Sequence, residues 1–216
     1  NSVVDRGLEV DVTDFKTLLT GNVELKIFAE TWVASGWVIS LEFDFLDGNP
    51  DYKYYQISPV IQFNNNSLGG VPYGGENGNT QIDETKFDLK KSISIGANIK
   101  SAHFRTIMSG WGHATPADSN GRACAEWCFR THKIKINNTN KFNHYMGPIG
   151  CASNPINNQG GNWSPDRAGW CPGMIVPVRI DKFDSDISSS NLEFEYYFEP
   201  WVNDFLGTPG YNNKNA

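Results

Sequence analysis

Hydrophobic and polar residues alternate with a period of two along several parts of the chain. Apolar side chains occupy every second position in residues 8–12, 23–27, 37–45 and 192–198. Because successive side chains of a strand point to opposite faces, this period is typical of half-buried antiparallel strands. The only helical pattern is a short turn over residues 15–19, which we expect Asp14 to cap and Gly21 to end. The pattern predicts an all-β sandwich fold.

The pattern breaks at a turn signal, Gly-Asn-Pro-Asp, over residues 48–51. We therefore expect one domain over residues 1–48 and a second over residues 49–216. The first segment holds about three predicted strands, fewer than two packed sheets normally need. It is expected to be the C-terminal part of a sandwich whose other strands lie in further polypeptide.

The composition supports a folded core and excludes some partners. Hydrophobic residues make up 39% of the 216 residues and aromatic residues 13%, enough for a sizeable core. The formal net charge is -6, so no face is expected to attract phosphate backbones or anionic lipid. No run approaches the roughly 18 apolar residues that span a bilayer. Nucleic acid and membranes are therefore not expected partners.

The four cysteines indicate disulfides. Cys124 and Cys128 form a C-x3-C pair, and Cys151 and Cys171 follow. An even count in a chain rich in Gly and Asn is typical of an oxidising compartment, so we expect a secreted or periplasmic protein. The alternative is a zinc site, but four thiolate ligands usually come as two tight pairs, and only one is present.

The histidines give no support to a metal site. They stand at four separate positions without the spacing of a metal motif: His103, His113, His132 and His144. We therefore expect neither a metal nor another cofactor.

Two glutamates are candidates for catalysis or substrate binding. Glu30 lies between Phe28 and Trp32 on one face of a predicted strand, where it could line a sugar site. The alternative is a solvated strand face with two incidental aromatic residues. Glu126 lies inside the Cys124–Cys128 frame, and a disulfide there would hold the carboxylate in one orientation. Here the alternative is a stapled loop whose glutamate points to water.

A third candidate is the irregular loop over residues 162–173, which holds Trp163, Arg167 and Trp170. Aromatic faces beside a guanidinium group suit carbohydrate hydroxyl and acetamido groups. The alternative is a loop anchored in the core by its tryptophans, with Arg167 bound to Asp166 or to the backbone.

Seven segments together resemble the peptide-N-glycosidase F family. They are GLEVDVTDF (7–15), ELKIFAETW (24–32), GVPYG (70–74), SGWGHA (109–114), CAEWCFRTH (124–132), NPINNQ (154–159) and SPDRAGWCPGM (164–174). The likeness runs from about Arg6 to about Trp201. It implies two jelly-roll β-sandwiches side by side, no metal, and a site where the two domains meet.

The resemblance also implies roles for individual residues. Glu30 and Glu126 match the two functional glutamates of the family. The residues that line the substrate site correspond to Trp32, Trp111, His113 and Arg167. The disulfides of the family would pair Cys124 with Cys128 and Cys151 with Cys171.

One departure concerns the primary catalytic residue of the family, an Asp in an upstream C-D-E-W-D-R segment that this sequence lacks. We expect that segment in further polypeptide of the same chain or in a bound fragment. After Val202 the sequence also leaves the pattern of the family.

The implied reaction is hydrolysis of the amide between the first N-acetylglucosamine and an asparagine of an N-linked glycoprotein or glycopeptide. Two alternatives stay open: a glycoside hydrolase that uses Glu30 and Glu126, and a module that binds N-glycans without cutting them.

Overall fold

The computed structural model describes a little more than half of the chain. The described residues are 7–27, 34, 36, 38–49, 55–60, 82–83, 89–110, 113–114, 124–154, 163–184, 187, 191–198 and 202–203. For residues 82–83, 113–114, 124–125, 198 and 202–203 only the backbone is described.

The chain forms two compact units, one of residues 11–57 and one of residues 1–10 with 58–216. The observed division therefore lies nine residues after the predicted one at 48/49 (57 against 48), and the first ten residues group with the larger unit. The assignment of residues 1–48 and 49–216 to two sandwich domains stays a prediction.

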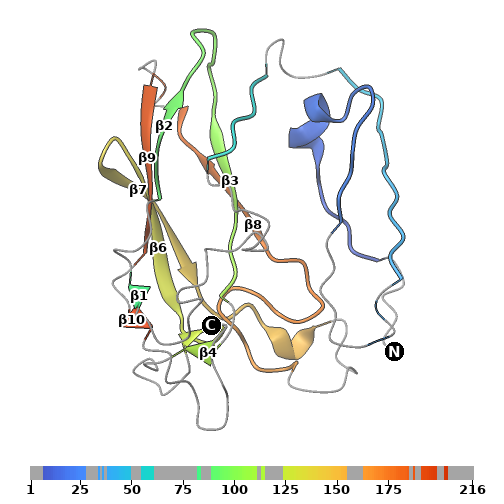
Figure 1. The fold of residues 1–216 in the computed structure, drawn as a ribbon, viewed down its shortest axis with the longest axis vertical. Helices are drawn as coiled ribbons and strands as arrows, with labels where there is room; N and C mark the ends of the chain where they lie inside the picture. Colours follow the sequence, from blue (N-terminus) through green and yellow to red (C-terminus); the bar gives the residue numbers. More distant parts are fainter. Residues whose placement is uncertain are drawn as a thin grey trace. The chain divides into compact units, whose positions relative to one another are not determined.

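All strand pairs of the described part are antiparallel and belong to the larger unit (Figure 1). The strands are β1 (Ile82–Asp83), β2 (Lys90–Ser94), β3 (His103–Ile107), β4 (His113–Ala114), β5 (Cys124–Ala125), β6 (Arg130–Ile136), β7 (Thr139–Met146), β8 (Val178–Lys182), β9 (Asn191–Phe198) and β10 (Val202–Asn203). The main sheet has the order β2-β9-β6-β7, and the other sheets pair β3 with β8, β1 with β10 and β4 with β5.

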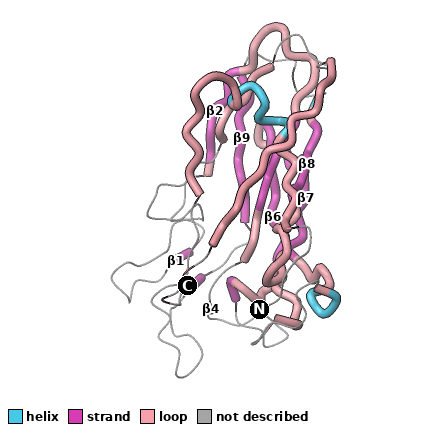
Figure 2. Tube along the Cα trace, turned by 90° about the vertical axis from the view of Figure 1, so that its right-hand side faces the viewer, coloured by secondary structure: helices cyan, strands magenta, loops and turns pink. Residues whose placement is uncertain are grey.

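The core forms where the main sheet packs against the β3-β8 pair. Phe104 of β3 stacks on Phe183 with ring centroids 4.4 Å apart and meets the edge of Phe194 of β9 at 5.0 Å. Figure 2 shows β9, β6 and β7 of the main sheet running side by side. The buried core residues are Phe104, Ile134, Ile136, Phe183, Leu192, Phe194 and Tyr196. This packing of two sheets is a β-sandwich, as the sequence predicted.

Strand β9 confirms the period-two prediction for residues 192–198. Its even-numbered residues Leu192, Phe194 and Tyr196 are buried, and the odd-numbered ones face away from the core. The hairpin between β6 and β7 turns on Asn137 and Asn138, both with positive φ, which Asn tolerates better than most residues.

The strand predictions for residues 8–12, 23–27 and 37–45 are wrong for the residues that the structure describes, which are irregular there. Alternation alone does not make a strand, because a strand needs a neighbour to take its hydrogen bonds. In the smaller unit, the described residues do not bury the apolar side chains. Leu25, Ile27 and Ile39 are about half exposed.

The predicted turn is present as the 3-10 helix η1 (Thr13–Leu18), but its cap was predicted wrongly. Asp14 lies inside the helix. The hydrogen bond at the helix start comes instead from the Thr13 N–H to Asp11 Oδ1. The first N–H groups of a helix have no partner within it, and a carboxylate two residues earlier can accept from one of them. Within the part of the chain that the structure describes, no helix has the length and apolar character to cross a membrane.

A buried polar layer lies on the core side of the main sheet. His132 Nδ1 is 2.7 Å from the Tyr196 hydroxyl. His144 Nε2 is 2.7 Å from Asp181 Oδ2, a close contact that lacks hydrogen-bond alignment. Burial, followed by the charges of His144, Arg179 and Arg130, lowers the pKa of His132 from 6.5 to about 4.

This layer should make the sandwich sensitive to acid. The unfolded chain binds a proton at His132 below about pH 6.5, and the folded chain does so only below about pH 4. The unfolded state therefore binds more protons at His132 between these values, so the contribution of His132 to stability should fall as the pH drops from 6.5 to 4 and then level off. At about 1.4 kcal/mol per pH unit, the loss should total roughly 3 kcal/mol.

Urea unfolding at a series of pH values measures this loss. His132→Asn should flatten the slope in that window, whereas His103→Asn, at the start of β3, should keep it. An unchanged slope in His132→Asn would show that other groups cause the acid sensitivity.

Candidate functional site

Three separate segments of the chain meet at the end of the sandwich beyond β3. The Gly110 N–H donates to the Ala168 carbonyl at 3.0 Å, and the Ala168 N–H donates to the Glu126 carbonyl at 2.7 Å. In addition, β4 pairs with β5, which places the backbone of His113 opposite Ala125. Backbone contacts thus join Gly110 and His113 to the segments of residues 124–128 and 163–171.

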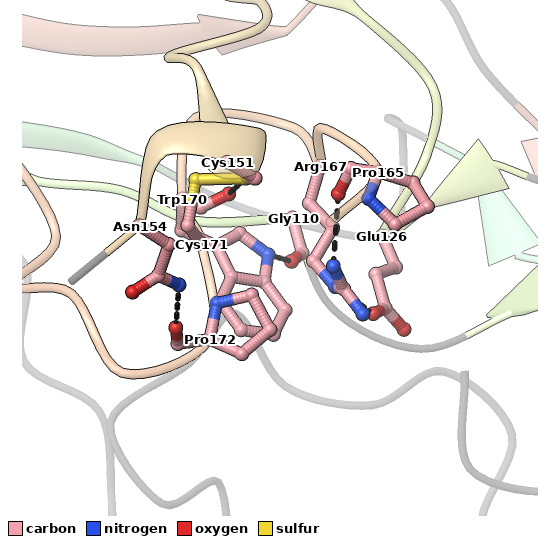
Figure 3. A network of polar contacts seen from close by, with 9 residues as sticks. All are labelled: Gly110, Glu126, Cys151, Asn154, Pro165, Arg167, Trp170, Cys171 and Pro172. Atoms are coloured by element: carbon pink, nitrogen blue, oxygen red, sulfur yellow. Dashed lines mark hydrogen bonds and ion pairs between the residues drawn. A yellow bond between two sulfur atoms is a disulfide. The ribbon is translucent and has the colours of Figure 1, made fainter. Parts of the chain in front are cut away.

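Glu126 and Arg167 form an ion pair at this junction (Figure 3). Arg167 Nε donates to Glu126 Oε1 at 2.6 Å, and Arg167 Nη1 donates to the Pro165 carbonyl at 2.9 Å. The Arg167 side chain is 6% exposed and that of Glu126 is 15% exposed. Charge-assisted hydrogen bonds in a partly buried place are stronger than exposed ones, so both side chains are held in fixed positions.

Two tryptophans flank the guanidinium group. Arg167 Cζ lies 4.5 Å from the ring centroid of Trp127 and 5.2 Å from that of Trp170. The Trp170 indole N–H donates to the Gly110 carbonyl at 2.5 Å, which fixes that ring. A guanidinium beside aromatic faces gains a cation–π attraction in addition to its hydrogen bonds.

A disulfide between Cys151 and Cys171 closes the loop that carries Arg167. Cys151 opens the 3-10 helix η4 (Cys151–Ser153), and the Asn154 side-chain amide donates to the Pro172 carbonyl on the other side of the bridge. This is the pairing that the resemblance implied. Cys128 is also disulfide-bonded, whereas the side chain of Cys124 lies outside the described part.

The disulfide occupies the two sulfur atoms of a group of residues that could otherwise hold a metal ion. Of the side chains that the structure describes, Cys151, Asp166 and Cys171 are grouped closely enough to hold an ion. Their sulfurs are bonded to each other and so offer no thiolate. None of the histidines with described side chains belongs to such a group.

The structure brings together two of the predicted site residues, Glu126 and Arg167. Glu30, Trp32 and Trp111 lie outside the described residues, and of His113 only the backbone is described. The sequence interpretation missed the position of Trp127 against Arg167. The signal was an aromatic residue directly after a glutamate that two cysteines frame.

The arrangement suits a carboxylate that must act in one direction. Glu126 keeps some contact with solvent, so a substrate group can approach it, while its partner Arg167 is almost fully buried. Preorganised charges of this kind can polarise or orient a reacting group without moving during the reaction.

Comparisons with known proteins show the family of the chain. Residues 78–200 match the family model described as peptide-N-glycosidase F, C terminal. The chain is 54% identical over 206 residues to the peptide-N(4)-(N-acetyl-beta-D-glucosaminyl)asparagine amidase F of Elizabethkingia miricola, covering 95% of this chain and 55% of the relative. The chain therefore spans about half the length of this curated relative.

Solved structures give the same result. The structure of PNGase F, a glycosylasparaginase from Flavobacterium meningosepticum, is 50% identical with a TM-score of 0.78, covering 95% of this chain and 64% of that one. A crystal structure of peptide-N(4)-(N-acetyl-beta-D-glucosaminyl) asparagine amidase at 2.2 Å resolution is also 50% identical, with a TM-score of 0.79 and the same coverage. The chain belongs to the peptide-N-glycosidase F family.

Proposed function

We propose that this chain is part of a secreted amidase that releases intact N-glycans from glycoproteins or glycopeptides. The observation that carries the proposal is the Glu126–Arg167 pair, in which the guanidinium group of Arg167 lies near the rings of Trp127 and Trp170. Both residues of the pair lie in segments that resemble the family. The relative from Elizabethkingia miricola is named an asparagine amidase that acts at an N-acetylglucosamine linkage.

In the proposed reaction, water adds to the carbonyl carbon of the asparagine side chain. The bond between that carbon and nitrogen breaks, the nitrogen leaves with the sugar as a glycosylamine, and aspartate remains. Glu126 polarises or orients the reacting group, and Arg167 holds the Glu126 carboxylate in one orientation. We propose that Glu30, Trp32, Trp111 and His113 contact the sugar.

The primary Asp would come from the upstream C-D-E-W-D-R segment, either in the same polypeptide or as a bound fragment. This fits the length of the relative, of which the chain covers 55%. We therefore expect residues 1–216 alone to lack amidase activity.

Product analysis tests the proposal. A glycopeptide incubated with this chain joined to the upstream segment should yield an aspartate peptide and an intact glycan, whereas residues 1–216 alone should leave it uncut. A peptide that keeps one N-acetylglucosamine would favour a glycoside hydrolase. Binding without cleavage by the joined protein would favour a glycan-binding module.

A further inference from the structure

The carboxylate of Asp166 binds three consecutive backbone amides. Its Oδ1 accepts hydrogen bonds from the N–H groups of Ile149 at 3.0 Å, Gly150 at 2.7 Å and Cys151 at 2.9 Å. The bond from Cys151 is the largest cause that lowers the pKa of Asp166, so this carboxylate stays ionised at neutral pH. Three charge-assisted bonds to one oxygen attach the loop of Asp166 firmly to residues 149–151.

Asp166 directly precedes Arg167, and the disulfide from Cys171 returns to Cys151. The loop that carries Arg167 is therefore attached to residues 149–151 at two points, by the Asp166 carboxylate before the arginine and by the disulfide of Cys171 after it. Residues 163–171 contain no helix or strand, so no regular hydrogen-bond ladder fixes this backbone. Directly after Arg167, backbone hydrogen bonds join Ala168 to Glu126 and Gly110. Directly before Arg167, the bonds of the Asp166 carboxylate hold the loop.

We propose that Asp166 is a positioning residue for Arg167: by holding the backbone ahead of it against residues 149–151, it directs the guanidinium group onto Glu126. The orientation of the guanidinium group matters because the hydrogen bond from Arg167 Nε to Glu126 Oε1 is short, at 2.6 Å. A shift of about 1 Å in such a group can lower the reaction rate by a large factor. The free energy of the pair thus depends on a residue that touches neither charged group.

The chain offers a matched control in Asp184. Its Oδ1 also accepts a backbone hydrogen bond, from Ala102 at 2.9 Å, and one from the Ser101 hydroxyl at 2.9 Å. Those bonds likewise lower the pKa of Asp184. Asp184 anchors the loop ahead of β3, whereas the Arg167 loop contacts Gly110, which follows β3.

Hydrogen exchange at the Arg167 Nε–H, followed by NMR, tests the proposal directly. Asp166→Asn should accelerate this exchange about tenfold or more, and Asp184→Asn should leave it unchanged. The proposal is overturned if Asp166→Asn exchanges as slowly as the wild type, or if both variants accelerate exchange equally. If Asp166→Asn does not fold, Asp166→Ser, which keeps one acceptor, decides by the same criterion.

A second arm measures turnover and rests on the proposed function. In the enzyme that contains the upstream segment, Asp166→Asn should lower kcat about tenfold with a smaller change in KM, and Asp184→Asn should change neither. Equal kcat in Asp166→Asn and wild type would overturn the positioning role. A wild-type enzyme that cuts no glycopeptide would instead contradict the proposed function and leave the exchange result to decide.

Discussion

Replacing Glu126 by Gln in the enzyme that contains the upstream segment should lower kcat by a factor of about 10² or more. Gln has nearly the same size, and its side-chain oxygen can still accept the hydrogen bond from Arg167 Nε. The substitution therefore removes the negative charge and the capacity to accept a proton while leaving the packing between residues 124 and 128 nearly unchanged. A group that acts on the reacting atoms should show its loss in kcat.

Steady-state kinetics on a denatured glycopeptide, with folding checked by thermal melting, measures this effect. The matched control is Glu195→Gln, because Glu195 also accepts from a cation, Lys135 at 3.2 Å, on the outer side of the main sheet. The control should keep wild-type turnover. A folded Glu126→Gln enzyme with near wild-type kcat would show that Glu126 is only part of a stapled loop.

Replacing Arg167 by Met should lower the free energy of unfolding by roughly 3 kcal/mol. Methionine keeps a long side chain between Trp127 and Trp170, but it removes the hydrogen bonds that Arg167 donates to the Glu126 carboxylate and to the Pro165 carbonyl. Removing one partner of a buried pair costs more than the pair contributes, since the other charge stays desolvated.

Urea unfolding of the two proteins gives this difference. Lys135→Met breaks a more exposed pair, with side chains 23% and 20% exposed, and should cost about 1 kcal/mol or less. An Arg167→Met loss as small as that of Lys135→Met would mean that solvent reaches Glu126 freely.

The sequence pattern located some strands and missed others for physical reasons. Strand β9 was predicted because its buried positions, Leu192, Phe194 and Tyr196, are all apolar or aromatic. Strand β6 carries Arg130 and His132 in the same phase as its buried Ile134 and Ile136, so polar residues interrupt the apolar alternation. The pairing of β6 with β9 joins residues about 60 positions apart, which a local pattern does not contain.

The sequence named Glu126 and Arg167 as candidates but did not predict their contact, and the roles of the candidate residues stay a prediction. The cysteine frame singled out Glu126, and the composition of its loop singled out Arg167. That the two meet could not be read from spacing, because they are 41 positions apart in the sequence. One alternative for Arg167 was a bond to Asp166 or to the backbone; it does bond the backbone at Pro165, while Asp166 binds residues 149–151.

The most direct test of the account is a double-mutant cycle of Glu126→Gln and Arg167→Met, measured as kcat on one glycopeptide. If Arg167 acts on the reaction only by directing the Glu126 carboxylate, the double variant should lose about as much as the worse single variant, because in Glu126→Gln no carboxylate is left for residue 167 to direct. Losses that multiply would contradict the account, since they would show that Glu126 and Arg167 act independently.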